Sequence, residues 1–359
     1  MARLEDVCEI LDSKRVPITA SNRKAGIYPY YGANGIQDYV DDYIFDDELV
    51  LLAEDGGHFG STDKPIAYRV SGKCWVNNHA HVLKPKSDLD VDYLCYALMF
   101  KDVSSIVNGA TRQKLTQADM REIDIPLPSL DEQKVIVKKI GKIFALISLR
   151  KQQLSKLDEL VKSRFIELFG GVEDEDTLIN LCTFIDYRGK TPDKSESGLP
   201  FITAKNVKMH HMSFETQEFI SKDTYDQVMT RGFPRIGDVV FTTEAPLGNV
   251  CRIPYIETEF YIGQRIITMQ TEQLEPAYLE YALSSDEFKR KIAEKSSGST
   301  VTGIRSKLLE QLTIPVPPRA LQKQFAAFVE QTDKSKFEIQ KSLEKFETLK
   351  KALMQKYFG

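Results

Sequence analysis

The strongest constraint on this chain is an internal repeat. A 48-residue block from Ile123 to Gly170 aligns without a gap with a second block from Leu312 to Gly359, at an offset of 189 residues. Eleven of the 48 aligned positions are identical, several times the chance level, and both blocks contain Ile-Pro-x-Pro from their third residue and close with Phe-Gly. A repeat this long predicts two similar halves, each a globular body followed by a long helix.

Proline pairs predict where each body ends. Ile125-Pro126-Leu127-Pro128 and Ile314-Pro315-Val316-Pro317-Pro318 cannot continue a helix. In the first block, Ser129 followed by two acidic residues predicts a helix start. We therefore expect a first body over residues 1–125, a central spacer helix over 126–170, a second body over 171–314 and a C-terminal spacer helix over 315–359.

Apolar residues in both predicted helices recur every seven positions, which favours a coiled coil. So narrow a stripe needs a partner helix, and the second helix has to run back along the first to provide it. About 38 helical residues would make a spacer of roughly 55–60 Å. The alternative is that each helix packs on its own body. The residues expected to pair the helices are Ile140, Ile147, Leu154, Val161, Phe325, Ile339, Leu343, Phe346 and Leu353.

The two bodies are related as well. Tyr93-Leu94-x-Tyr96-Ala97-Leu98 matches Tyr278-Leu279-x-Tyr281-Ala282-Leu283, which predicts a short helix in each body. The run Glu48–Glu54 matches Asp238–Glu244, which predicts a buried strand that leads into a loop. The expected fold is α+β, an internal tandem repeat. It has two similar mixed α/β, strand-rich domains separated by two long helices that form an antiparallel coiled coil.

Charge follows the same repeat. The two bodies each carry a net charge of −6 and the two helices each carry +4. An overall basic footprint, typical of nucleic-acid binders, is missing, so DNA binding would require basic residues gathered on one face. Five scattered cysteines, no apolar run of membrane-spanning length and an acidic N-terminus predict a cytoplasmic protein that does not enter the membrane.

Catalytic and metal-binding motifs are missing from the sequence. It contains no phosphate-binding or dinucleotide-binding glycine loop, no nucleophile elbow and no H-E-x-x-H. His79 and His81 stand two apart on a predicted strand, and His210 and His211 lack nearby cysteines, so hydrogen-bonding roles are favoured over a metal site. We expect no catalytic residues and no metal.

Polar, glycine-containing loops with basic or aromatic residues occur in both bodies. Arg and Lys suit phosphates and guanine edges, whereas Asn suits adenine edges. For any single loop, an ordinary solvated turn is as good an interpretation. The residues expected to bind DNA are Tyr31, Asn34, His58, Asn78, His79, Arg112, Lys114, Arg188, Lys190, Lys205, Asn206, Lys208, Arg265, Ser299, Arg305 and Lys307.

With these features the chain resembles the specificity subunit of type I restriction–modification systems along its whole length. The resemblance rests on the two Ile-Pro-x-Pro helix blocks, on Ala53–Gly57 with Trp75–Leu83, and on Arg188–Pro192 with Gly237–Val240. The ending Leu349–Gly359 adds to it. One departure is Arg319-Ala320-Leu321-Gln322, where the family prefers Leu-x-Glu-Gln; we attribute it to drift at a helix start.

The resemblance implies a non-catalytic subunit with two target-recognition domains, each of which reads one half of a split double-stranded DNA sequence. It also implies partners, namely two methyltransferase subunits and one restriction/translocase subunit. No cofactor is expected in this subunit; the partners would use S-adenosylmethionine, ATP and Mg.

Two other interpretations remain. The chain could be a protein-binding scaffold with two modules on an antiparallel coiled coil, which acidic bodies would also suit. It could also be an enzyme with an unrecognised site, which would require a deep apolar pocket with buried titratable groups. Basic loops that converge on one face of each body, both on the same side of the spacer, would favour DNA binding over the scaffold.

Overall fold

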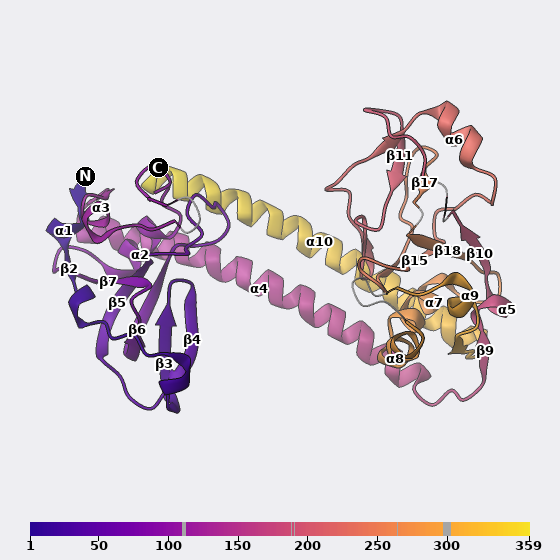
Figure 1. The fold of residues 1–359 in the computed structure, drawn as a ribbon, viewed down its shortest axis with the longest axis horizontal. Helices are drawn as coiled ribbons and strands as arrows, with labels where there is room; N and C mark the ends of the chain where they lie inside the picture. The colour runs from indigo at the N-terminus through magenta and orange to yellow at the C-terminus, as the bar shows by residue number, and fades with distance from the viewer. Residues whose placement is uncertain (110–112, 188, 190, 264, 297–302) are drawn as a thin grey trace. The chain divides into compact units, whose positions relative to one another are not determined.

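The computed structural model describes residues 1–109, 113–187, 189, 191–263, 265–296 and 303–359 (Figure 1). The chain divides into two compact units. Unit 1 contains Met1–Gln152 and Gln340–Gly359, and unit 2 contains Gln153–Ile339. Each unit therefore combines one body with one part of each long helix.

The body of unit 1 is built on one sheet. Its six strands lie in the order β2 (Cys8–Ile10), β7 (Ala80–Pro85), β5 (Phe45–Ala53), β6 (Ala67–Val76), β3 (Ala25–Gly32) and β4 (Gly35–Val40). Neighbouring strands are antiparallel except β3 and β6. Successive apolar side chains of β5 enter two different buried clusters, Val50 and Leu52 in one and Leu49 and Leu51 in the other. Burial on both faces explains why residues 49–53 of this strand form a continuous apolar run.

Short elements complete this body. Helix α2 (Val91–Met99) packs on β5 and β6 and contributes Tyr93, Leu94 and Leu98 to the larger cluster. Strand β1 (Ala2–Arg3) pairs with β8 (Asp124–Ile125) and so joins the two ends of the body. The remaining elements are α1 (Leu4–Val7), the 3-10 turns η1 (Asp12–Lys14) and η2 (Ala20–Asn22), and α3 (Gln117–Arg121).

The body of unit 2 repeats this scaffold. Its four-stranded antiparallel sheet has the order β10 (Thr183–Asp186), β18 (Ile266–Gln270), β15 (Val239–Thr242) and β16 (Val250–Arg252), which corresponds to β2, β7, β5 and β6. Strand β9 (Glu175–Thr177) pairs with β19 (Thr313–Pro315), as β1 does with β8. Helices α5 (Leu178–Leu181), α7 (Pro276–Ser284) and α9 (Ser306–Glu310) correspond to α1, α2 and α3.

Unit 2 also has elements of its own. A second, three-stranded sheet consists of β14 (Phe219–Ile220), β11 (Leu199–Ile202) and β17 (Tyr261–Ile262), and β12 (Val207–Lys208) pairs with β13 (His211–Met212). Helix α6 (Lys222–Val228) follows β14, and α8 (Asp286–Lys295) follows α7. The expected fold class is thus confirmed, with the two scaffolds alike and their additions different.

The long helices are α4 (Leu130–Phe169) and α10 (Arg319–Phe358), each 40 residues. Helix α4 begins as predicted, because Ser129 and Glu132 form reciprocal hydrogen bonds in a capping box. In unit 1, Ile140 of α4 shares a cluster with Phe358 of α10, and further along α4, Lys151 pairs with the earlier Glu347 at 3.2 Å. The two helices therefore run antiparallel in this unit.

Unit 2 shows the same direction. Phe165 and Phe169, near the end of α4, pack on Phe325, near the start of α10, with ring centroids 5.4 and 5.5 Å apart. Lys336 pairs with the earlier Asp158 of α4. All nine predicted pairing residues are at least half-buried: Ile140, Ile147, Val161, Phe325 and Leu343 fully, and Leu154, Ile339, Phe346 and Leu353 partly.

A buried glutamine of the repeat joins each body to its following helix. Gln133 accepts a hydrogen bond from Asp90 N (2.8 Å) and donates to Asp88 O and Pro128 O (both 2.9 Å). Its counterpart Gln322 accepts from Glu275 N (2.9 Å) and donates to Pro317 O (2.8 Å). The repeated Gln-Lys of the sequence therefore marks a structural junction, and Gln322 keeps this contact despite the departure at Arg319–Gln322.

No helix within the described ranges is both long enough and apolar enough to cross a membrane.

Candidate nucleic-acid interface

Loops that are distant in sequence meet where β5 ends. Asn34 Nδ2 donates to Gly56 O (3.0 Å), and Gly56 N donates to Gln113 O (3.3 Å). His79 Nδ1 lies 2.8 Å from Asp55 Oδ1. A hollow of about 320 Å³ opens among these loops. We call this surface the body-one face; it consists of residues 33–37, 55–56, 79 and 113–114.

Several DNA-binding candidates of body one gather on or beside this face. Asn34 and Lys114 are exposed on it, and His79 is half-buried in the wall of the hollow. Asn78 and His58 are exposed in the same loops. Tyr31 lies inside β3 against Tyr68 (ring centroids 5.7 Å apart), and burial raises its pKa. Arg112 lies outside the described residues.

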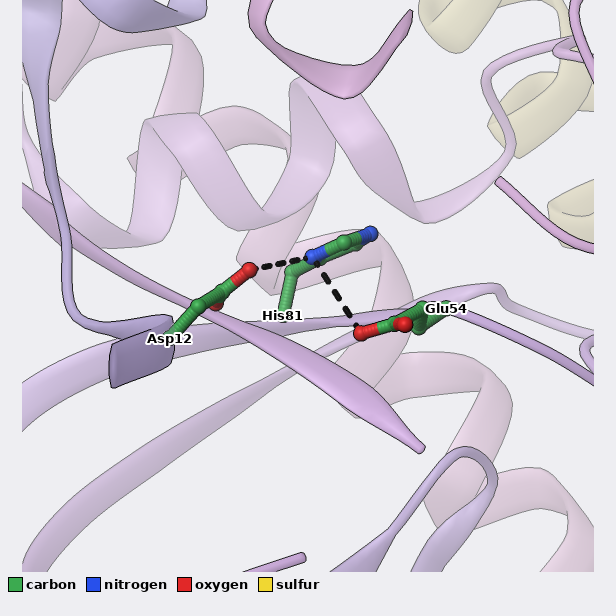
Figure 2. A group of neighbouring side chains, drawn as sticks. All are labelled: Asp12, Glu54 and His81. Atoms are coloured by element: carbon green, nitrogen blue, oxygen red, sulfur yellow. Dashed lines mark hydrogen bonds and ion pairs between the residues drawn. The ribbon is translucent and has the colours of Figure 1, made fainter. Parts of the chain in front are cut away.

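Beneath the face lies a buried group of three ionisable side chains, Asp12, Glu54 and His81 (Figure 2). His81 Nδ1 is 2.6 Å from Asp12 Oδ2 and 3.7 Å from Glu54 Oε2. His81 Nε2 lies 3.0 Å from Leu115 O. The sequence did not predict this group, because its members are up to 69 residues apart and no spacing motif links them.

These residue types could ligate a metal, but protein groups occupy the positions around them. Arg15 Nη1 lies 2.5 Å from Glu54 Oε2, and Lys114 Nζ lies 3.0 Å from Glu54 Oε1. Gln117 Nε2 donates to Asp12 Oδ2 (2.9 Å). Two cationic side chains beside the carboxylates oppose a bound cation, so the geometry favours a structural ion-pair network. That the chain binds no metal stays a prediction.

The network also sets the ionisation of its acids. Burial opposes the charged form of Asp12, but hydrogen bonds from His81, Val82 and Gln117 together outweigh it and lower the pKa of Asp12. Burial acts in the same way on Glu54, where Arg15 and Lys114 outweigh it and lower the pKa. Both acids are therefore ionised at neutral pH and hold the loop that carries Lys114.

Body two places an acidic and a basic side chain at the equivalent position, the end of its central strand. Thr243 N donates to Arg265 O (2.9 Å), as Glu54 N does to His79 O (2.9 Å). The strand registers agree, since Ala53 pairs with Ala80 and Thr242 pairs with Ile266. Glu244 is therefore the counterpart of Asp55, and the sequence match of Glu54 with Glu244 was wrong by one residue. Arg265 Nε lies 2.8 Å from Glu244 Oε1.

A hollow of about 250 Å³ lies beside this pair and carries basic side chains. Lys194, Lys205 and Arg265 line it, together with Phe201 and Glu218. Lys194 pairs with Glu218 at 2.8 Å. We call this surface the body-two face; it consists of residues 191, 194, 201, 203–205, 218, 245, 263 and 265. Lys194 was not singled out in the sequence, where it is one of many exposed lysines.

The other candidates of body two have different environments. Lys208, Arg305 and Lys307 are exposed, none of them on the body-two face as defined. Asn206 is buried: its Oδ1 accepts from Thr203 N (2.9 Å), and its Nδ2 donates to Ser213 O and Thr216 O. These bonds shape the loop that carries Lys205. Arg188, Lys190 and Ser299 lie outside the described residues.

Each unit also contains an apolar groove between a long helix and its body. In unit 1 the groove measures about 450 Å³ and is lined by Tyr96, Ala97, Phe358 and Gly359 among others. In unit 2 it measures about 410 Å³ and is lined by the repeat counterparts Tyr281, Ala282, Phe169 and Gly170. The repeat thus builds the same groove twice.

Comparison with known proteins identifies the family. The family model described as the type I restriction modification DNA specificity domain matches residues 1–159 and again residues 178–348. The chain therefore belongs to the family of type I restriction–modification specificity subunits and carries two DNA specificity domains in tandem, which confirms the resemblance seen in the sequence.

Individual relatives agree. A Haemophilus influenzae protein named as a type I restriction enzyme specificity subunit is 27% identical over 379 residues, which covers 98% of this chain and 88% of that protein. The crystal structure of the type I S subunit from M. genitalium superposes with a TM-score of 0.65 at 15% identity over 100% of this chain and 95% of that one. A chain from a study of complex assembly and conformational transition in the type I system gives 0.54 at 19% identity, over 99% and 96% of the two chains.

Proposed function

We propose that each of the two specificity domains reads one half of a bipartite double-stranded DNA target, and that the paired helices fix the gap between the halves. The observation that carries this proposal is the duplicated scaffold with two different faces. The end of the central strand presents Asn34, His79 and Lys114 in body one, whereas in body two it presents Lys194, Lys205 and Arg265. Different polar groups on one scaffold suit two different base sequences.

The acidic bodies are compatible with this function because charge is unevenly distributed. Among the described residues, three basic side chains line the body-two hollow although that body carries a net charge of −6. The two net-basic helices add further cations. Phosphate contacts would come from these groups and from partner subunits, so DNA affinity should fall steeply with salt.

The two equivalent apolar grooves support two copies of one partner. We assign them to the two methyltransferase subunits, because identical partners need repeated sites and the groove walls repeat from one unit to the other. A restriction/translocase subunit would join this assembly. In this proposal the chain is non-catalytic, cytoplasmic and free of cofactor, and the partners use S-adenosylmethionine, ATP and Mg.

The test is to assemble the chain with its methyltransferase subunit and map the methylated sites on genomic DNA. Two short sequences at one fixed separation are the expected result. A continuous motif would contradict two reading domains. Protein partners with no DNA specificity at all would favour the scaffold alternative.

The groove assignment is tested through stoichiometry. Ile166 is 58% exposed and lines the unit-2 groove, whereas Leu149 is 47% exposed on the same helix and lines neither groove. Ile166→Asp should remove one methyltransferase copy from the complex in native mass spectrometry, and Leu149→Asp should leave two. Two copies bound to both variants would refute the assignment.

A further inference from the structure

The two bodies share an acid–base pair at one equivalent position. Asp55 and Glu244 follow the central strand, and His79 and Arg265 lie opposite them at the start of the neighbouring strand. Nδ1 of His79 is 2.8 Å from Asp55, and Nε of Arg265 is 2.8 Å from Glu244. The next loop crosses at the same place in both bodies, since isolated backbone β-bridges join Asp55 to Lys114 and Glu244 to Gly303.

Stability does not account for the body-two pair. The side chains of Arg265 and Glu244 are 54% and 42% exposed. Ion pairs this exposed contribute little to folding, because water screens the charges and two long side chains must be held still. The pair recurs at one position with different residues, and the exposed body-two pair, which stabilises the fold little, is better explained by what it presents outward.

The geometry of Arg265 shows what is presented. Glu244 Oε1 lies 2.8 Å from Nε of Arg265, and within the described part of the chain neither Nη1 nor Nη2 donates a hydrogen bond to a protein group. These two nitrogens form the end of the guanidinium fork, which fits two adjacent acceptors such as guanine O6 and N7 or two phosphate oxygens. His79 lines the hollow of the body-one face, and Arg265 lines the hollow of the body-two face.

We propose that Glu244 and Asp55 are positioning residues for DNA recognition, which hold Arg265 and His79 in the orientation that contacts the target. This inference rests on the proposed function, since it names groups within the two reading faces. The ligand of Arg265 is a pair of adjacent oxygen or nitrogen acceptors on duplex DNA, and the ligand of His79, whose Nδ1 faces Asp55, is a single acceptor. A histidine in one domain and an arginine in the other, each held by an acidic residue at the same position, would give each domain its own DNA sequence preference.

The test uses the chain assembled with its methyltransferase subunits and a duplex that carries the mapped target, with Kd measured at several salt concentrations. Arg265→Ala should weaken binding about five- to 150-fold. Relaxed preference at one base pair would indicate a base contact. Uniform weakening with a salt slope reduced by about one would indicate a phosphate contact.

Glu244→Gln separates positioning from other roles. It should weaken binding at least about twofold in the parent and add nothing in the Arg265→Ala background, as coupled residues do. Glu259→Gln is the matched control, because it removes one acid from an exposed pair with Lys222 in the same body and changes net charge equally. It should leave affinity unchanged or raise it slightly.

Three results would overturn the inference: unchanged binding by Arg265→Ala, tighter binding by Glu244→Gln, or an equal effect of Glu244→Gln with and without Arg265. Each leaves the proposed function standing, provided that the parent complex still discriminates target from scrambled DNA. A parent complex without that discrimination would refute both.

Discussion

At the scale of single residues, the Asp12–Glu54–His81 network of body one consists of buried ionisable side chains that each need a partner. It buries two carboxylates and an imidazole and satisfies them with Arg15, Lys114, Gln117 and backbone groups. A buried charge without its partner costs several kcal/mol, so the members depend on one another. The network ties the turn at Asp12 to the loop at Lys114 and thereby supports the body-one face.

Body one should consequently lose stability in acid. The pKa values of Asp12 and Glu54 are lowered from ordinary values of 3.8 and 4.5, so their contribution is complete above about pH 4.5 and is lost as pH falls through the lowered values. The single tryptophan, Trp75, lies in this body and reports its unfolding. The urea concentration at the midpoint of unfolding, followed by tryptophan fluorescence, should decrease as the pH falls below about 4.5.

Asp12→Asn is the matching variant. It should be destabilised at pH 7, and the difference from the parent should shrink as pH falls toward 3, because the parent then loses the same charge. A difference that stays constant between pH 7 and pH 3 would mean that the Asp12 carboxylate does not contribute through its ionisation.

The junction glutamines make a second prediction at this scale. Gln133→Ala leaves Asp90 N, Asp88 O and Pro128 O without their partner in a buried site, which should cost about 1–3 kcal/mol. Gln152→Ala, at an exposed position of the same helix, should change the free energy of unfolding by less than about 0.5 kcal/mol. Urea unfolding measures both, and equal effects would contradict the junction role.

At the scale of elements, the long helices are held by a narrow stripe whose neighbours face water. Val161 is fully buried, whereas the adjacent Leu160 is 49% exposed. Val161→Asp would place a charge against Phe165 and Phe325 of the same cluster and should destabilise unit 2 by several kcal/mol. Leu160→Asp should be tolerated. Thermal unfolding distinguishes them, and similar melting temperatures would refute the pairing.

The sheets show what sequence comparison can miss at this scale. The buried strands and short helices were predicted from the matching runs, and both are present as β5, β15, α2 and α7. The alignment nevertheless slipped by one residue at Glu54, because two acidic residues follow β5 and only one follows β15. Hydrogen-bond register, which sequence identity does not contain, resolves the choice in favour of Asp55.

At the scale of the whole molecule, the proposed function requires a fixed gap between two reading domains. Seven inserted residues keep the heptad pattern and add about 10 Å to a helix. Placed after Gln152 and after Ile339, they should lengthen the gap of the methylated motif by about three base pairs at ~3.4 Å each. Each half-site should be unchanged. An unaltered gap would show that the helices do not set the spacing.

The sequence by itself determined the tandem architecture, and it predicted the limits of the long helices and their pairing stripe, because repeats, prolines and heptads are patterns along the chain. Tertiary structure decided which residues share a face. The Asp12–His81 contact, the Glu244–Arg265 pair and the hollow beside Lys194 join residues separated by 69, 21 and up to 74 positions. Such contacts depend on strand order and register, so no spacing of residues in the sequence predicts them. Asn206 shows the opposite case. An asparagine suits a base edge, but the buried side chain of Asn206 forms hydrogen bonds with the backbone of its own loop.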